Sequence, residues 1–244
     1  MERFVEPSVV LSTVDYGEAD RLVTLLSRGR GKLTAFAAGA RKSKRRFAGA
    51  LEPMTLLDAQ LTERRGTTFR LDGAVIQRAF QAVRGDLGRI SRALYAVELC
   101  RELCREHEPH PGLFDHLVAY LGELDGGRAG PTSLIAFELD ALAQGGFQPR
   151  FDRCALCGGA LGERTRFDPE HGGAVCERCW ARSSYGVEVA PGTVAALRGL
   201  QEGRRTPLPA PERKAARELL NLFIAFQLGR PLKSVEFMVQ VGVD

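Results

Sequence analysis

Short runs in which apolar and polar residues alternate occupy the first 80 positions of the chain. The alternation is clearest at Leu33, Ala35 and Ala37, whose side chains would all point to one face of a strand. Five short strands in succession are typical of a small closed barrel of the OB or SH3-like type, and a fragment of a β-sandwich is the alternative. The other four strands are predicted at residues 9–14, 22–26, 54–61 and 67–76.

The period of the apolar residues changes after Gly85. Leu87, Ile90, Leu94 and Val97 recur every three or four positions, which predicts an amphipathic helix with Asp86 as its N-cap. Further helices are predicted from similar stripes at residues 113–124, 134–142 and 219–226. We therefore expect an α+β protein with an OB-like or SH3-like barrel at residues 1–80 and an all-α domain that packs as one bundle, built from residues 81–150 and 186–244.

Four cysteines lie in the segment 151–185, which interrupts the predicted helices. Cys154 and Cys157 form one C-x-x-C pair, Cys176 and Cys179 form the other, and eighteen residues separate the pairs. This spacing is typical of a zinc ribbon with a hairpin between two knuckles. Four thiolates fill the tetrahedral shell of Zn²⁺ and leave no position for water, so the site is predicted to be structural and not catalytic. A redox pair and metal-free reduced cysteines are the alternatives.

The other two cysteines, Cys100 and Cys104, lie four positions apart on the first predicted helix. Cysteine in such a position is more often a small buried apolar residue than a ligand, so we assign both to packing.

Positive charge is concentrated near the N-terminus. Residues 1–80 contain fourteen Arg or Lys against nine Asp or Glu, an excess of five positive charges, whereas the remaining residues have a balance of −1. Five of these charges fall within the six positions from Arg41 to Arg46, directly after a predicted strand. A basic loop on a small barrel is a common way to hold a phosphate backbone, and a solvated loop is the alternative. Tyr16, Phe36 and Phe47 are the nearby aromatic residues that would offer stacking surfaces for bases.

Several classes of protein are disfavoured. The acidic residues Glu2, Glu6, Asp15 and Glu18 interrupt the first twenty positions, so no secretion signal is expected there. No apolar run approaches the ~18 residues of a membrane-spanning helix, and no G-x-x-x-x-G-K-[ST] loop for ATP is present. We expect a cytoplasmic protein that is not an enzyme.

Several stretches of the chain match one family in order. The residues that carry the likeness are 10–11, 15–23, 31–42, 51–53 and 231–234. In these stretches the chain resembles the RecO family of recombination mediators. Members of that family that carry a zinc module place it inside the C-terminal helical domain.

The resemblance implies an N-terminal OB-fold, a helical C-terminal domain and binding to single- and double-stranded DNA. It also implies annealing of complementary strands in DNA repair by the RecF pathway and association with the nucleoid. The implied partners are RecR, single-strand-binding protein and, indirectly, RecA, which is loaded onto DNA covered by single-strand-binding protein. The residues to which DNA contact is transferred are Arg41, Lys42, Lys44, Arg45 and Arg46, together with Lys32, Arg64 and Arg65. The alternative function is that of a zinc-ribbon interaction protein whose basic arm binds structured RNA.

Overall fold

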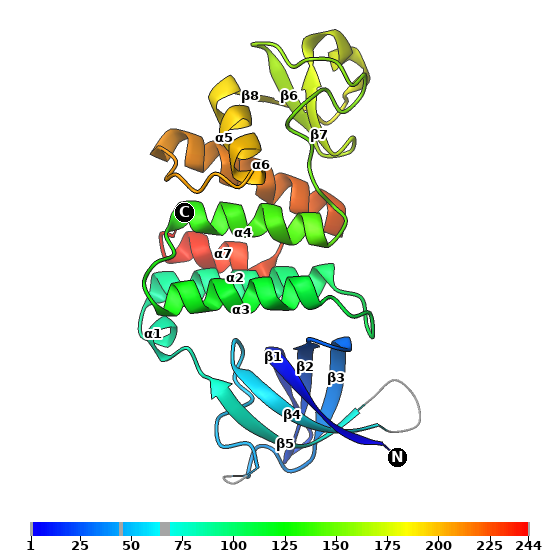
Figure 1. Cartoon of the computed structure of the whole chain (residues 1–244), viewed down its shortest axis with the longest axis vertical. Helices are drawn as coiled ribbons and strands as arrows, with labels where there is room; N and C mark the ends of the chain where they lie inside the picture. Colours follow the sequence, from blue (N-terminus) through cyan, green and yellow to red (C-terminus); the bar gives the residue numbers. More distant parts are fainter. Residues whose placement is uncertain (1, 44–45, 64–68, 244) are drawn as a thin grey trace. The chain divides into compact units, whose positions relative to one another are not determined.

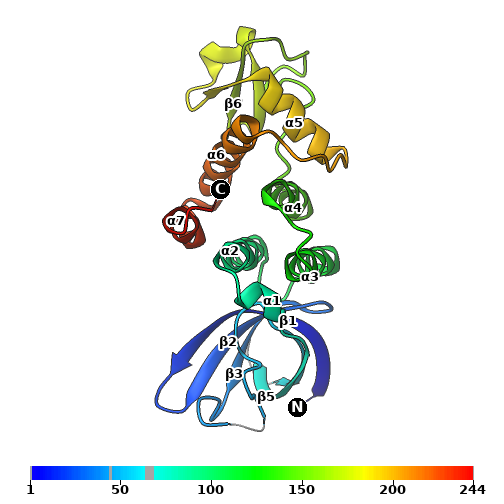
Figure 2. The same cartoon turned by 90° about the vertical axis from the view of Figure 1, so that its left-hand side faces the viewer.

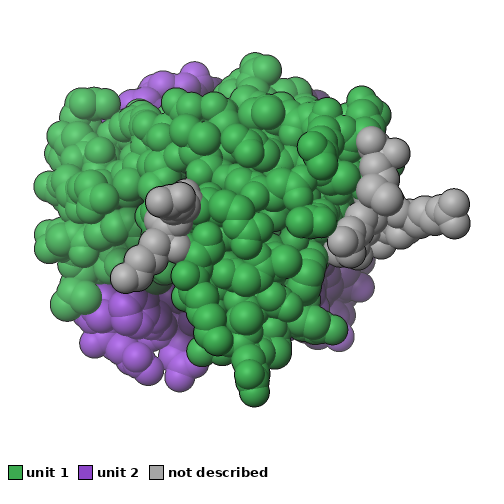
Figure 3. Space-filling view, turned by 90° about the horizontal axis from the view of Figure 1, so that it is seen from below, with its two compact units in different colours: residues 1–128 green, residues 129–244 purple. Residues whose placement is uncertain are grey.

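The computed structural model of the chain describes residues 2–43, 46–63 and 69–243. By its contacts the chain divides into two compact units, Met1–Arg128 and Ala129–Asp244 (Figure 3). The boundary lies between two helices of the segment for which we predicted a single helical domain. The predicted domain limits therefore stay a prediction, and each unit is described by itself below.

The first unit begins with a closed five-stranded barrel (Figure 1). Its strands pair in the order β1-β2-β3-β5-β4, and β1 also pairs with β4 to close the barrel. All pairs are antiparallel except that between β3 and β5. The α+β class with an N-terminal five-stranded OB-like barrel is thus confirmed. The strands are β1 (Arg3–Tyr16), β2 (Asp20–Ser27), β3 (Gly31–Ala37), β4 (Leu56–Glu63) and β5 (Phe69–Arg78).

The interior of the barrel is filled by the apolar positions of the alternating pattern. Leu33, Ala35 and Ala37 of β3 are fully buried, and so are Leu57 and Ala59 of β4. Because successive side chains of a strand point to opposite faces, the residues between them face outward. The same alternation that predicted the strands therefore also sets which side chains are available on the outside of the barrel.

Among the residues of the first unit that the structure describes, three helices follow the barrel: α1 (Gln81–Arg84), α2 (Leu87–Leu103) and α3 (Pro111–Asp125). Helices α2 and α3 lie side by side, and α1 contacts both of them (Figure 2). The predicted cap of α2 is confirmed, because a side-chain oxygen of Asp86 accepts a hydrogen bond from the Arg89 backbone N–H at 2.8 Å. Cys100 and Cys104 are both buried, as predicted.

The chain that follows α2 is bound to the edge of the barrel. The His107 backbone N–H donates to the Lys32 carbonyl at 2.9 Å. Gly31 has a φ of +72°, and a Cβ atom at this position would lie 1.9 Å from the Glu108 carbonyl oxygen. A glycine is required here for both reasons, since it tolerates the left-handed conformation and lets the two backbones approach.

In its described residues the second unit contains four α-helices, one 3₁₀ helix and a small three-stranded sheet of order β7-β6-β8. The sheet and the cysteine-containing segment lie between α4 and α5 in the chain, as expected for a module inserted among helices. Within the described residues, no helix is long and apolar enough to cross a membrane. The elements are α4 (Pro131–Gln144), β6 (Thr165–Asp168), β7 (Gly173–Cys176), the 3₁₀ helix η1 (Glu177–Arg182), β8 (Val187–Val189), α5 (Pro191–Gln201), α6 (Ala210–Leu228) and α7 (Lys233–Gln240).

The helices of the second unit enclose a buried ion pair. Arg217 of α6 donates through Nη1 to Oε1 of Glu138 on α4, and the two side chains are 8 % and 0 % exposed. The other terminal nitrogen of Arg217 lies 3.9 Å from the Met238 sulfur atom of α7. This pair links three helices that are far apart in the sequence.

Candidate functional site

The structure brings the four predicted cysteine ligands together. Cys154 and Cys157 lie on a turn that precedes β6, Cys176 ends β7, and Cys179 lies in η1. Their four sulfur atoms all lie within 4.8 Å of one another. The sulfur atoms of Cys157 and Cys176 are 3.8 Å apart, and two ligands at ~2.3 Å from a tetrahedral metal ion are separated by roughly this distance. The cluster therefore has the size and the donor set that a tetrahedral thiolate site needs.

Backbone hydrogen bonds shape the first knuckle around Cys154. The Gly158 N–H donates to the Cys154 carbonyl at 2.9 Å, and Gly158 adopts a φ of +70° to make the turn. The Cys154 N–H donates to the Gly159 carbonyl, and the Cys176 N–H points to the Cys154 sulfur at 3.4 Å. Such N–H groups stabilise a thiolate, which is the form that binds a metal ion.

The thiols of the cluster have unequal proton affinities. Burial raises the pKa of Cys154, but hydrogen bonds from the backbone N–H groups of Cys176, Cys157 and Leu156 outweigh burial and lower that pKa to about 6. Burial and the neighbouring sulfur atoms raise the pKa of Cys179 to about 12. A bound cation would favour the thiolate form of all four ligands and release the remaining protons.

Apolar side chains enclose the cluster. Ala155, Leu156, Leu161 and Trp180 pack against the buried cysteines Cys154, Cys176 and Cys179, whereas Cys157 is exposed. The Trp180 ring also contacts two guanidinium groups, of Arg164 at 4.5 Å and of Arg166 at 4.2 Å from the ring centroid. With four thiolate donors and this apolar surround, the arrangement suits a structural site and offers no open position for chemistry.

The tip of the β6–β7 hairpin holds a second group of possible ligands, Asp168, Glu170 and His171. The buried Asp168 carboxylate already accepts hydrogen bonds from the Glu170 and His171 backbone N–H groups at 2.9 and 3.3 Å, and it lies 2.9 Å from the His171 Nδ1 atom. These bonds hold the turn. His171 belongs to this turn and not to the cysteine cluster.

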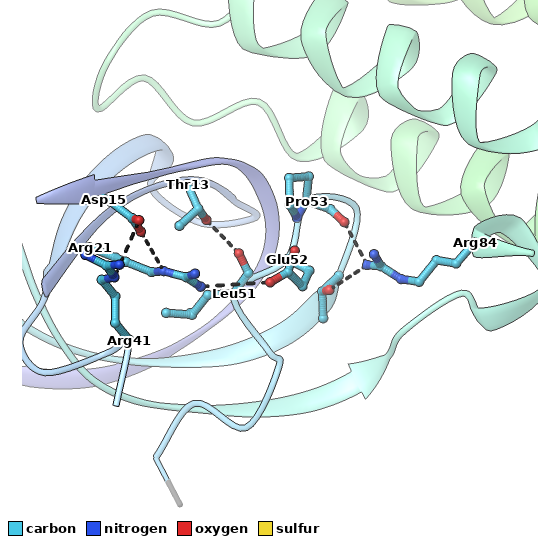
Figure 4. Close-up of polar contacts among 9 residues, drawn as sticks. Thr13, Asp15, Arg21, Arg41, Leu51, Glu52, Pro53 and Arg84 are labelled. Atoms are coloured by element: carbon cyan, nitrogen blue, oxygen red, sulfur yellow. Dashed lines mark hydrogen bonds and ion pairs between the residues drawn. The ribbon is translucent and has the colours of Figure 1, made fainter. Parts of the chain in front are cut away.

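The predicted basic loop lies between β3 and β4, and polar contacts fix both of its ends (Figure 4). Near the start, Arg41 lies 3.5 Å from an oxygen of Asp15, a carboxylate that also pairs with Arg21 at 3.1 Å. Near the end, the Thr13 hydroxyl donates to the Leu51 carbonyl at 2.6 Å, and Arg84 donates to the Pro53 carbonyl at 2.8 Å. Sequence reasoning did not find these anchors, since they join residues up to 38 positions apart.

The eight predicted DNA contacts are not equivalent in the structure. Lys42 is exposed and makes no ion pair within the described residues, and Arg41 is exposed but shares Asp15. Arg46 is exposed and donates to the Ala38 carbonyl at 2.6 Å. The Lys32 ammonium donates to the Arg101 carbonyl at 3.0 Å and pairs with Glu106 at 3.8 Å, so its charge is already used within the unit. Lys44, Arg45, Arg64 and Arg65 lie outside the described residues.

Two of the three predicted stacking residues lie on the outside of the barrel. The Tyr16 side chain is 56 % exposed and meets the half-buried Phe36 ring edge to face, with 5.8 Å between the ring centroids. Phe47 is 2 % exposed and belongs to the core cluster of the barrel, so its predicted role as a stacking surface is wrong. An apolar ring that closes the barrel under a loop has the same sequence signal as an exposed ring in that loop.

The fold and the two sites define a class of protein. Its members have an OB-like barrel with a basic loop and a surface aromatic pair, followed by helices with an inserted four-cysteine module. The chain belongs to the Recombination protein O family, because its residues 1–80 match the model of the family's N-terminal part and residues 84–236 match that of its C-terminal part.

Relatives of full length support this assignment. The chain is 64% identical over 244 residues to the DNA repair protein RecO of Myxococcus xanthus, and the match covers 100% of both chains. It is 51% identical to the DNA repair protein RecO of Anaeromyxobacter dehalogenans strain 2CP-C, over 99% of this chain and 98% of the relative. It is 38% identical to that of Geobacter sulfurreducens, with 96% of each chain covered.

Proposed function

We propose that this protein is a non-catalytic recombination mediator in DNA repair, which binds single- and double-stranded DNA and anneals complementary strands. With RecR it helps to load RecA onto DNA coated by single-strand-binding protein, and it acts in the cytoplasm at the nucleoid. The observation that carries the proposal is the surface of the barrel on which Tyr16 and Phe36 lie near the basic loop with Arg41 and Lys42. Its family and the names of its relatives agree with a role in DNA repair.

Annealing needs no covalent chemistry. Two strands repel each other through their phosphates, and a positively charged surface lowers that repulsion while the bases stay free to pair. Aromatic rings stack on any base because every base has a π-face, so binding through Tyr16 and Phe36 is expected to have little sequence preference. This combination is sufficient for an annealing protein without a nucleophile or an activated water.

We rank the proposed DNA contacts by how exposed each side chain is and by the bonds that it already makes within the protein. Lys42 and Arg41 are the strongest candidates for DNA contact, because they are exposed at an anchored loop, and Arg46 is the next. Lys32 is a weaker candidate, since a strand would have to displace its bonds to Arg101 and Glu106. Lys44, Arg45, Arg64 and Arg65 remain in the proposal on the basis of the family resemblance.

The proposed role of the cysteine cluster is to hold a structural Zn²⁺ through Cys154, Cys157, Cys176 and Cys179. The cation would supply the bonds that join the knuckle before β6 to the end of β7 and η1. The module is small and its apolar core consists largely of the cysteines themselves with Val175, so the metal would replace a hydrophobic core.

The test is fluorescence anisotropy of labelled single-stranded oligothymidine across a salt series. In the loop variant, Arg41, Lys42, Lys44 and Arg45 are changed to Ala. The control variant removes the same charge from exposed positions of the second unit by changing Arg198, Arg204, Lys214 and Lys233 to Ala. Each lost contact to a single strand lowers the salt slope by ~0.7, so the loop variant is expected to bind more weakly with a slope flatter by roughly 3.

The control variant is expected to keep the affinity and slope of the unmodified protein. The same proteins are then assayed for annealing of two complementary oligonucleotides by energy transfer between their labels, and the loop variant should anneal slowly. If the unmodified protein ignores single-stranded DNA but binds a hairpin RNA, the mediator proposal fails and the RNA-binding alternative replaces it.

A further inference from the structure

The outside of the barrel carries a second group of arginines, on the β1, β4 and β5 side. The strand register places Arg3 of β1 opposite Thr62 of β4, and Thr62 opposite Arg70 of β5. Neighbouring strands lie ~4.8 Å apart, so the two arginines flank Thr62 in one row across three strands. Arg70 is also paired in register with Phe36 of β3, which connects this row to the aromatic pair.

These arginines line a hollow in the barrel surface. Its volume is about 500 Å³, within the ~300 to 1,000 Å³ of small-molecule sites. One wall is apolar, with Leu61, Phe4 and the 60 % exposed Val5. The polar side chains that line it are Arg3, Arg46, Gln60, Arg70 and Asp72.

The charges in the hollow are not balanced. Three arginines and one aspartate line the hollow, and both oxygens of Asp72 are engaged, with Oδ1 at 2.8 Å from Arg70 Nε and Oδ2 accepting from the Thr62 hydroxyl at 2.5 Å. Arg46 donates to the Ala38 carbonyl and lies 5.1 Å from the Phe47 ring centroid, but within the part of the chain that the structure describes neither Arg46 nor Arg3 makes an ion pair. A cavity with excess guanidinium groups favours an anion, and the planar fork of Arg matches a phosphate.

We propose that this arginine pocket binds a backbone phosphate of single-stranded nucleic acid, with the attached nucleoside against the apolar wall of Phe4 and Val5. The inference rests on the proposed function and extends it, because it adds a contact outside the basic loop. The shared row through Phe36 and Arg70 gives a strand stacked on Tyr16 and Phe36 a short route to the pocket.

The pocket is tested with the double variant Arg3→Gln and Arg70→Gln in the full-length protein. The matched control is Arg198→Gln with Lys214→Gln, which removes the same charge from two helix residues whose ion pairs, within the described residues, are with Glu202 and Glu218 close by in the sequence. Anisotropy of labelled oligothymidine is measured across a salt series. Each lost phosphate contact weakens strand binding and lowers the salt slope by ~0.7, so the double variant is expected to bind more weakly with a slope flatter by ~1.4.

Arg3→Gln alone is the second variant, because Arg70 pairs with Asp72 and its loss also disturbs the barrel. This single variant should keep the melting temperature of the unmodified protein and lose roughly half of the slope change, ~0.7. Binding of thymidine monophosphate and of inorganic phosphate is measured directly, by calorimetry at millimolar concentration, for the unmodified protein and the double variant. If the double variant keeps strand binding but loses the binding of either small anion, the pocket takes a free nucleotide or phosphate and the inference is overturned.

The failure of this inference differs from the failure of the proposed function. If the unmodified protein binds the strand, the loop variant binds weakly and the double variant behaves as its control, the pocket does not contact the strand although the basic loop does. If the unmodified protein does not bind any single-stranded DNA, the proposed function itself fails.

Discussion

The cysteine module and the barrel show two different relations between sequence and site. In the module, four residues at a fixed spacing specify the donor set, and local turns bring their sulfur atoms together within 4.8 Å. On the barrel, the positive charges that can meet a ligand are those of arginines and lysines that are not already bonded to other residues of the unit. Lys32 bonds to Arg101 and Glu106, whereas Arg3, far from the basic loop in the sequence, lines an open pocket. A metal site can be read from spacing, but a surface for nucleic acid needs the tertiary contacts.

The largest expected effect comes from removing the metal from the cysteine module, which should leave the barrel unaffected. Cys176→Ser should abolish stoichiometric zinc and unfold the module, because a structural zinc site contributes on the order of 10 kcal/mol to folding. Metal content and limited proteolysis measure this, and strand binding by the barrel should stay within about twofold of the unmodified protein. The control is Cys100→Ala with Cys104→Ala, which should keep the zinc. Full zinc content in Cys176→Ser would contradict the proposed ligand set.

The next prediction concerns the buried ion pair between helices of the second unit, which should stabilise these helices without the metal. Arg217→Met leaves the Glu138 carboxylate buried without its guanidinium partner, which costs about 3 to 5 kcal/mol. Urea unfolding measures the loss. The double variant Arg217→Met with Glu138→Leu should recover most of the stability, since replacing both charges by apolar groups removes the desolvation cost. A double variant that is as unstable as the single one would show that other contacts of these residues dominate.

In the first unit, Gly31 is the position where a small change should disturb the barrel most. Gly31→Ala forces a left-handed conformation on alanine, worth about 1 to 3 kcal/mol, and also meets the Glu108 backbone. Gly17→Ala is the matched control, because Gly17 has a similar φ of +62° and a Cβ atom added there would meet nothing within 4 Å. The difference in the free energy of unfolding between the two variants isolates the clash. Equal losses would mean that the chain after α2 moves away at little cost.

The outcomes for fold and site follow from how far apart the interacting residues lie. Alternation and helical periodicity predicted the barrel and helices because both depend on neighbours within about four positions. The N-cap at Asp86 was predictable for the same reason, and the four cysteines were predictable because two C-x-x-C pairs at this separation are typical of a zinc site. The buried ring of Phe47, the Arg217–Glu138 pair and the arginine pocket were not, since each depends on residues brought together from distant strands or helices. The register from Arg3 through Thr62 to Arg70 appears only once the barrel is closed.

The smallest expected effect concerns the Arg28–Asp115 ion pair, and it tests which basic residues of the barrel remain available to a ligand. Arg28 donates two hydrogen bonds to the Asp115 carboxylate at 2.9 Å each, so this basic residue belongs to the N-terminal excess but is already paired. The hydrogen bond from Arg28 lowers the pKa of Asp115, although desolvation opposes it. A carboxyl group whose pKa is lowered by folding stabilises the protein above its unfolded pKa, and this contribution is lost as the pH falls through the folded pKa.

Asp115→Asn should therefore lower the melting temperature slightly at pH 7, and the difference from the unmodified protein should shrink as the pH falls below the unfolded pKa of ~3.9. High salt should shrink it as well, because both side chains are half exposed and screened. Thermal unfolding at both pH values and at two salt concentrations measures the effect. If the difference persists at low pH, the effect comes from packing and not from the ion pair. Arg28 would then count among the barrel residues whose charge is available to contact a DNA strand.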